Sequence, residues 1–147
     1  MDEAPTRLRS KTSWLINKVS LHAHRLLSEA LSPIDARGYH FSMLAALEES
    51  GPASQAELSR RCGIDRSDTV EMLNELSEQG LIVRTPDDAD RRRNIITITA
   101  AGRRRLTELD KTLTALQADL LTPLSRTERD QLTALLTRVL AHHTDPA

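Results

Sequence analysis

Residues 54–99 read SQAELSRRCGIDRSDTVEMLNELSEQGLIVRTPDDADRRRNIITIT. Ser54-Gln55-Ala56-Glu57 has the pattern of a capping box, in which the serine accepts from the third backbone N–H of a helix and the glutamate reaches back. Gly63-Ile64 then turns the chain, and Asp65 is placed to cap a second helix over residues 66–79. This pattern predicts two short helices joined by a tight turn.

The periodicity changes after the second helix. Residues 81–84 and 94–99 are rich in β-branched side chains, as strands are. The segment between them, residues 85–93, holds three aspartates and three arginines and predicts an exposed, charged hairpin tip. The order helix, turn, helix, hairpin is that of a winged helix-turn-helix domain. Within the second helix we expect Val70, Leu73 and Leu76 to face the core.

Helical patterns continue on both sides of this domain. Before it, residues 11–31 and about 37–49 have apolar residues at helical spacing, with His22 and His40 on the apolar stripes. After it, Thr99 is placed to cap a helix from about 100 to 121. Its leucines alternate at spacings of three and four, a seam that favours a partner helix: Leu106, Leu109, Leu113, Leu116 and Leu120.

A last helix is expected to open at Ser125, which begins a second capping box with Glu128. It has its own apolar stripe from Leu132 to Leu140. The expected fold class is therefore mainly α with a small β-hairpin. We expect a single domain over residues 1–147, whose winged part spans about 36–100.

Composition excludes several classes of protein. The chain has 147 residues, with 20 Lys and Arg against 21 Asp and Glu, and a net charge of −1. This length fits one domain, and the near-neutral balance argues against binding nucleic acid by bulk charge. One Trp, one Tyr and one Phe are too few for a platform that stacks single strands or RNA. No apolar run approaches a membrane span and no signal peptide is evident, so we expect a cytoplasmic protein with no membrane partner.

The sequence also lacks the signals of an enzyme or a metal site. It has no glycine-rich phosphate loop, no His-Glu-x-x-His and no Gly-x-Ser-x-Gly, so we expect neither catalytic residues nor a cofactor. The single cysteine, Cys62, follows Leu58 by four residues and is expected to be a small core residue rather than an oxidant sensor. His22, His24 and His40 form no obvious zinc-ligand set.

Positive charge is concentrated in one region. Between Arg84 and Arg105 there are seven arginines and three aspartates, a net charge of +4. A neutral protein with such a basic face binds duplex DNA through that face. Because the start of a recognition helix enters the major groove, we expect Arg66, Ser67 and Thr69 to contact bases.

Three stretches resemble the MarR family of transcriptional regulators. That family's wing has Asp-x-Arg, five residues and Leu-Thr, and this chain has Asp90-Arg91-Arg92, residues 93–97 and Ile98-Thr99. Leu76–Ile82 and Thr99-Ala100-Ala101-Gly102 match as well. The resemblance follows the chain in order over nearly its whole length.

The resemblance implies a homodimer whose terminal helices, about 8–32 and 100–143, intertwine. It also implies a repressor that binds a pseudo-palindromic DNA operator, with Asp90 orienting Arg92 into the minor groove. Arg91 and Arg93 in the wing, and Ser54 and Gln55 at the start of the first helix, complete the expected DNA contacts. The chain departs from the family at Asp68 and Glu71, and we expect one of these either to pair with a nearby arginine or to accept from cytosine.

In the family, a cleft between the dimerisation helices and the DNA-binding part holds a small effector. We expect any such effector to be small and aromatic or weakly acidic. The candidate lining residues are Trp14, His22, Tyr39 and His40, and the alternative for each is that it packs in the core. Two alternatives remain open from the sequence. The winged helix could serve as a protein–protein interaction module, or the chain could be a metal-responsive regulator.

Overall fold

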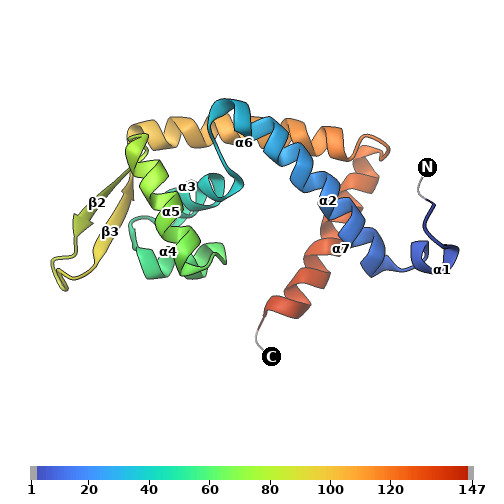
Figure 1. The fold of residues 1–147 in the computed structure, drawn as a ribbon, viewed down its shortest axis with the longest axis horizontal. Coiled ribbons are helices and arrows are strands. Elements are labelled where there is room, and N and C mark those ends of the chain that lie inside the picture. Colours follow the sequence, from blue (N-terminus) through green and yellow to red (C-terminus); the bar gives the residue numbers. More distant parts are fainter. Residues whose placement is uncertain (1–2, 146–147) are drawn as a thin grey trace.

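The computed structural model describes residues 3–145 (Figure 1). The fold is mainly helical with one small sheet, which confirms the expected fold class. Its elements follow in the order α1 (Thr6–Arg9), α2 (Thr12–Leu31), η1 (Ser32–Ile34), α3 (Gly38–Ser50), β1 (Ala53–Ser54), α4 (Gln55–Cys62), α5 (Arg66–Glu78), β2 (Ile82–Pro86), β3 (Asn94–Ile98), α6 (Ala100–Leu120) and α7 (Arg126–Thr144).

Four helices begin at the capping residues that the sequence indicated. The side chains of Ser54, Asp65, Thr99 and Ser125 each accept from the backbone N–H three residues later. At Ser125 the reciprocal bond is present as well, because the Glu128 carboxylate accepts from the Ser125 N–H at 2.9 Å. These caps satisfy N–H groups that have no partner within their own helix.

The wing belongs to a three-stranded antiparallel sheet of order β1-β3-β2. β2 and β3 form the expected hairpin, with Ile82 opposite Ile98 and Pro86 opposite Asn94. The sequence pattern did not indicate β1, which has only two residues and pairs Ala53 with Ile96. The strand is too short for any periodicity, and it joins the hairpin to the start of α4.

The core of the winged part lies between α3, α4, α5 and the sheet. From α5 it receives Thr69, Met72, Leu73 and Leu76, all with no exposed surface. Val70, which we expected in the core, is 39% exposed instead. The helix is rotated so that the small threonine takes the core position while the neighbouring valine faces solvent.

α6 connects the base of the wing to the far end of the molecule (Figure 1). Its 21 residues span about 31 Å at 1.5 Å per residue. Leu106, Leu109 and Leu116 are buried within the chain, on a helix that packs against α2 and α3. The partner helices of these three leucines therefore lie in the same chain.

The start of α6 lies very close to the strand that precedes it. The N–H of Gly102 bonds to the Thr99 hydroxyl at 3.0 Å, and a Cβ at Gly102 would overlap the carbonyl oxygen of Leu81 and the side chain of Ile98. Only glycine fits at this contact. It sets how closely α6 approaches the sheet.

Two apolar surfaces remain uncovered. α7 extends from the end of α6 (Figure 1), and none of its described residues is buried. These two surfaces are formed by exposed apolar side chains on α7 and on the first half of α2: Leu135, Leu136, Val139 and Leu140, and Leu15, Ile16, Val19 and Leu21. Between residues 3 and 145, no helix is both long and apolar enough to cross a membrane.

Candidate DNA-binding site

A hollow of about 310 Å³ lies where α4, α5 and the wing meet. Arg66 enters it from the first turn of α5, while Arg92 and Arg93 enter from the wing. The hollow is otherwise lined by small or polar side chains: Ser54, Gln55, Ala56, Ser59 and Asn94. Of the expected DNA contacts, this hollow gathers five: Ser54, Gln55, Arg66, Arg92 and Arg93.

At the wing tip, Asp90 holds Arg92 in a fork. The Nε of Arg92 donates to Asp90 Oδ1 at 3.1 Å and its Nη2 donates to Oδ2 at 3.3 Å. The backbone N–H of Arg92 also donates to Oδ1 at 3.1 Å. These bonds from the Arg92 side chain and backbone lower the pKa of Asp90. The Arg92 side chain is still 91% exposed, so the fork fixes its direction without covering it.

A second pair stiffens the base of the same loop. Arg93 donates to Asp87 Oδ2 at 2.8 Å, and the N–H of Ala89 donates to Asp87 Oδ1 at 3.0 Å. These two bonds, the backbone bond first, lower the pKa of Asp87. Arg91 is exposed and has no hydrogen bond or ion pair with any residue from 3 to 145. The loop thus presents two directed arginines and one free to turn.

The start of α5 differs in part from the expectation. Arg66 and Ser67 are exposed, and the Ser67 hydroxyl donates to the capping Asp65 at 2.9 Å. Thr69, which we expected to contact bases, is wholly buried. Its hydroxyl donates to the Asp65 carbonyl at 2.8 Å and accepts from Ser59 at 2.8 Å, so it joins α5 to α4.

Ser54 is likewise only 3% exposed. Its hydroxyl caps α4 and lies 3.3 Å from the Glu57 carboxylate. It borders the hollow but its polar atoms are already engaged. Its place in the site is therefore to position Gln55 and the first turn of α4.

Two acidic residues of α5, Glu71 and Glu75, are paired with an arginine, and Glu71 is one of the two residues for which we expected such a pair. Arg37, just before α3, donates to Glu71 at 3.3 Å and to Glu75 at 3.1 Å. Sequence reasoning missed Arg37, because it lies 34 and 38 residues from its partners. Further along α5, Arg84 donates to Asn74 at 3.0 Å.

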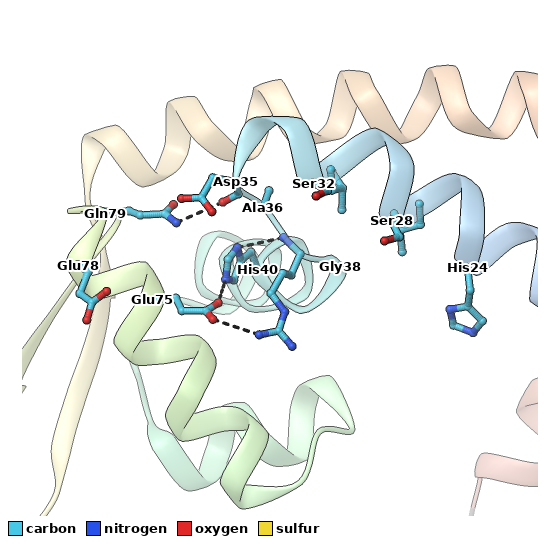
Figure 2. A pocket seen from close by; sticks show the side chains of 13 residues that line it. His24, Ser28, Ser32, Asp35, Ala36, Gly38, His40, Glu75, Glu78 and Gln79 are labelled. Atoms are coloured by element: carbon cyan, nitrogen blue, oxygen red, sulfur yellow. Dashed lines mark hydrogen bonds and ion pairs between the residues drawn. The ribbon is translucent and has the colours of Figure 1, made fainter.

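A cleft of about 630 Å³ lies on the opposite side of α5, between that helix, α2 and the start of α3 (Figure 2). Its centre is His40, which is 2% exposed. His40 Nδ1 accepts the backbone N–H of Arg37 at 3.2 Å, and Nε2 lies 2.6 Å from Glu75 Oε2. Both bonds are satisfied by a neutral ring that has its proton on Nε2.

Glu75 is the carboxylate that this cleft shares with the recognition helix. Partial burial raises its pKa, but the hydrogen bonds from His40 and Arg37 and the Arg37 charge outweigh that effect, so the pKa lies below its ordinary value. Glu78 and Gln79 continue the same wall of the cleft. Two residues of α5, Glu75 and Glu78, and its C-cap, Gln79, therefore line the cleft.

Only one of the four residues expected in the effector cleft lies there. His40 lines it, whereas Trp14, His22 and Tyr39 do not. His22 is exposed and its Nδ1 lies 3.4 Å from Arg25. Tyr39 is 43% exposed, and Trp14 is half-buried with the Lys18 ammonium 5.6 Å from its ring centre. His24, two positions from His22, lines the cleft instead.

Two further expectations concern metal and thiol chemistry. Within residues 3–145, no three His, Cys, Asp or Glu side chains are grouped so that they could hold a metal ion. Cys62 packs against the core while half-buried. Burial raises the pKa of its thiol more than the charge of Arg61 lowers it, which favours the unreactive thiol form.

Comparison with known proteins agrees with this geometry. A family model described as MarR family matches residues 31–93. A Thauera aromatica protein named "Putative transcriptional regulatory protein for hcr operon" is 33% identical over 99 residues, which cover 67% of this chain and 60% of that protein's length. The chain belongs to the MarR family. The relatives found by these comparisons are transcriptional regulators, not enzymes.

Solved structures of family members superpose over nearly the whole chain. The transcriptional repressor CouR, bound to a 23-mer DNA duplex, has a TM-score of 0.83 and 28% identity, with 95% of this chain and 99% of that chain covered. A mutant MarR from E. coli complexed with operator DNA has a TM-score of 0.73 and 28% identity, with 86% and 91% covered. The MarR fold thus extends to the helices outside the family-model match.

Proposed function

We propose that this MarR-family regulator is a cytoplasmic, homodimeric repressor that binds a pseudo-palindromic operator and is released by a small effector. The observation that carries DNA binding is the convergence of Arg66, Arg92 and Arg93 on one hollow between α5 and the wing. Two structural relatives, CouR and the E. coli MarR mutant, are bound to DNA.

The arrangement suits duplex DNA. The start of α5 fits the major groove, where Arg66 and Ser67 are exposed for contact. The wing then lies along the flanking backbone, and Asp90 aims Arg92 into a narrow minor groove, where the negative potential is strongest. Arg91 and Arg93 lie beside it and neutralise phosphates.

The uncovered apolar surfaces support the dimer. α7 buries none of its described side chains within one protomer, although it has four exposed large apolar residues. Surfaces of this kind on a folded chain mark an interface with a partner. A second copy that pairs α2 and α7 of both chains would cover them and place two wings on one face.

The cleft around His40 is the proposed effector site. It borders α5 directly, so a bound molecule can alter the position of the recognition helix without touching DNA. A weakly acidic aromatic molecule would compete with Glu71 and Glu75 for Arg37. Such a molecule releases DNA only if it binds the DNA-incompetent arrangement more tightly.

Selection from randomised duplexes tests the DNA-binding function. The protein should enrich one inverted-repeat sequence, and its affinity measured by fluorescence anisotropy should fall steeply as salt rises. If the chain were a protein–protein module instead, no sequence would be enriched. For the effector, benzoate serves as a simple acidic aromatic probe. His40→Ala should abolish any benzoate-induced release, whereas the exposed His22→Ala should leave it intact.

A further inference from the structure

The exposed face of α5 has one apolar side chain among polar ones. Val70 is 39% exposed, whereas Thr69, Met72 and Leu73 around it are wholly buried. It follows Arg66 by four residues, so the two lie on the same face of the helix. From this placement we infer that Val70 is a specificity-determining residue, which contacts the 5-methyl group of a thymine in each operator half-site.

Two polar neighbours of Val70 on this face, Glu71 and Asn74, are already held by other side chains. Glu71 accepts from Arg37 at 3.3 Å, and Asn74 accepts from Arg84 at 3.0 Å. Each would have to leave a charged partner to bond to a base edge. Val70 has no such partner to give up, and its side chain is exposed on this face.

The chemistry of the major groove provides one apolar target. The thymine methyl group is the only apolar substituent that a base presents there, and it distinguishes thymine from cytosine. A valine matches it well, because its branched side chain has little rotamer freedom to lose when it is buried. Contact between the valine side chain and the thymine methyl group removes the apolar surface of both from water, which favours binding.

This assignment rests on the proposed function, and its test separates the two. The preferred duplex from the selection is resynthesised with deoxyuridine in place of thymine, one symmetric pair of positions at a time, which removes only the methyl groups. For one symmetric pair of positions, we expect the uracil substitution to weaken binding of the parent protein about fourfold for each half-site. The two half-sites together should then weaken it about fifteenfold. All other pairs should change affinity by less than twofold.

Two variants identify the side chain responsible. Val70→Thr keeps one methyl group and should keep much of the uracil sensitivity, while Val70→Ser removes it and should bind the thymine and uracil duplexes within twofold of each other. Val70 is on a helix surface, so both substitutions should retain the fold. Val83→Ala, at a valine 48% exposed on β2, is the matched control and should respond to uracil as the parent does.

The outcomes are distinct. Equal uracil sensitivity in the parent and in Val70→Ser would overturn the assignment of Val70 while leaving the proposed DNA binding intact. A selected duplex that no uracil pair weakens would do the same. Failure to enrich any duplex would overturn the proposed function and this assignment together.

Discussion

His40 Nε2 lies 2.6 Å from Glu75 Oε2 and thereby joins α3 to the recognition helix α5. The His40 side chain is 3% exposed and the Glu75 side chain is 31% exposed. Arg37 completes the group from the other side of the same carboxylate at 3.1 Å. The bond holds α5, the helix proposed to face DNA, to the wall of the cleft proposed for the effector.

Removing this acceptor should destabilise the fold. Glu75→Ala leaves the buried Nε2–H of His40 without a partner, and we expect a loss of about 1–3 kcal/mol in the free energy of unfolding. Glu75→Gln keeps an acceptor oxygen and should lose less than half as much. Urea unfolding followed by circular dichroism measures both, and equal losses would show that the hydrogen bond to His40 is not what matters.

The same carboxylate should contribute to acid sensitivity. Its pKa in the folded state is depressed below the ordinary value of 4.5, so it binds protons more readily in the unfolded chain. Its stabilising effect is therefore complete above the unfolded-state pKa and is lost as pH falls through the depressed folded-state pKa. Between pH 6 and pH 3, the free energy of unfolding should fall less steeply in Glu75→Gln than in the parent. It should still fall in the variant, because Asp87 and Asp90 titrate in both proteins. Parallel curves would refute the assignment.

Gly102 should not tolerate alanine. In most helices a change from glycine to alanine stabilises by about 1 kcal/mol, but here the new methyl group would overlap the Leu81 carbonyl. We expect Gly102→Ala to destabilise by about 1–3 kcal/mol, because α6 must move away from the sheet. Gly38→Ala is the matched control. Its Cβ would meet only the end of the Leu27 side chain, at 3.1 Å, and its melting temperature should stay near that of the parent.

Arg92 should matter for DNA and not for folding. Its side chain is 91% exposed, so Arg92→Ala should change stability by less than about 0.5 kcal/mol. Operator binding should weaken by about 1–3 kcal/mol per wing contact, with a shallower salt dependence. Asp90→Ala should cost less, because it removes only the fork that aims Arg92.

Anisotropy titrations at several salt concentrations measure these effects, and Arg7→Ala, on α1, controls for the loss of one positive charge. Unchanged affinity and salt slope in Arg92→Ala would exclude Arg92 from the DNA contact.

Charges on α7 should separate the protomers. Leu136→Asp with Val139→Asp places two carboxylates in the exposed apolar stripe, where nothing in one protomer is buried. Sedimentation should show a monomer that keeps the helical signal of the winged part, and operator affinity should fall. Ala134→Asp, on the opposite face of α7, should remain dimeric. A double variant that stays dimeric would locate the interface elsewhere.

Local signals explain why much of the fold could be predicted. Ser54, Asp65, Thr99 and Ser125 cap helices through bonds that span three residues, so the residues involved are adjacent in the sequence. The Asp90–Arg92 fork spans two residues and agrees with what the family resemblance implied. The sequence signals for the helix caps and for this fork therefore lie within the short segments that form them.

Side-chain burial was harder to predict, because it depends on what lies opposite. Val70 has the more apolar side chain, yet Thr69 occupies the core, since its hydroxyl finds partners on Ser59 and Asp65 there. The leucines of α6 have the spacing of an intermolecular seam, but α2 and α3 of the same chain pack against that helix. No local pattern distinguishes a partner in the same chain from one in another.

The cleft was the least predictable part. Arg37 reaches residues 34 and 38 positions away, so nothing near it in the sequence indicated its role. On α2, apolar residues occur on more than one face, so the sequence did not show which of His22 and His24 borders the cleft. Both are exposed, and only His24 lines the cleft.

The single tryptophan of the chain gives the molecule an intrinsic optical reporter. Trp14 lies in the first turn of α2, next to the apolar residues Leu15 and Ile16. The start of α2 is at the end of the molecule opposite the wing (Figure 1). Indole emission therefore senses the environment of that end alone, and quenching or spectral shifts there would report formation of the proposed dimer. Since no indole lies near Arg92 or α5, a fluorescent operator can be titrated in the same cuvette, and the two signals separate assembly from DNA binding without labelling the protein.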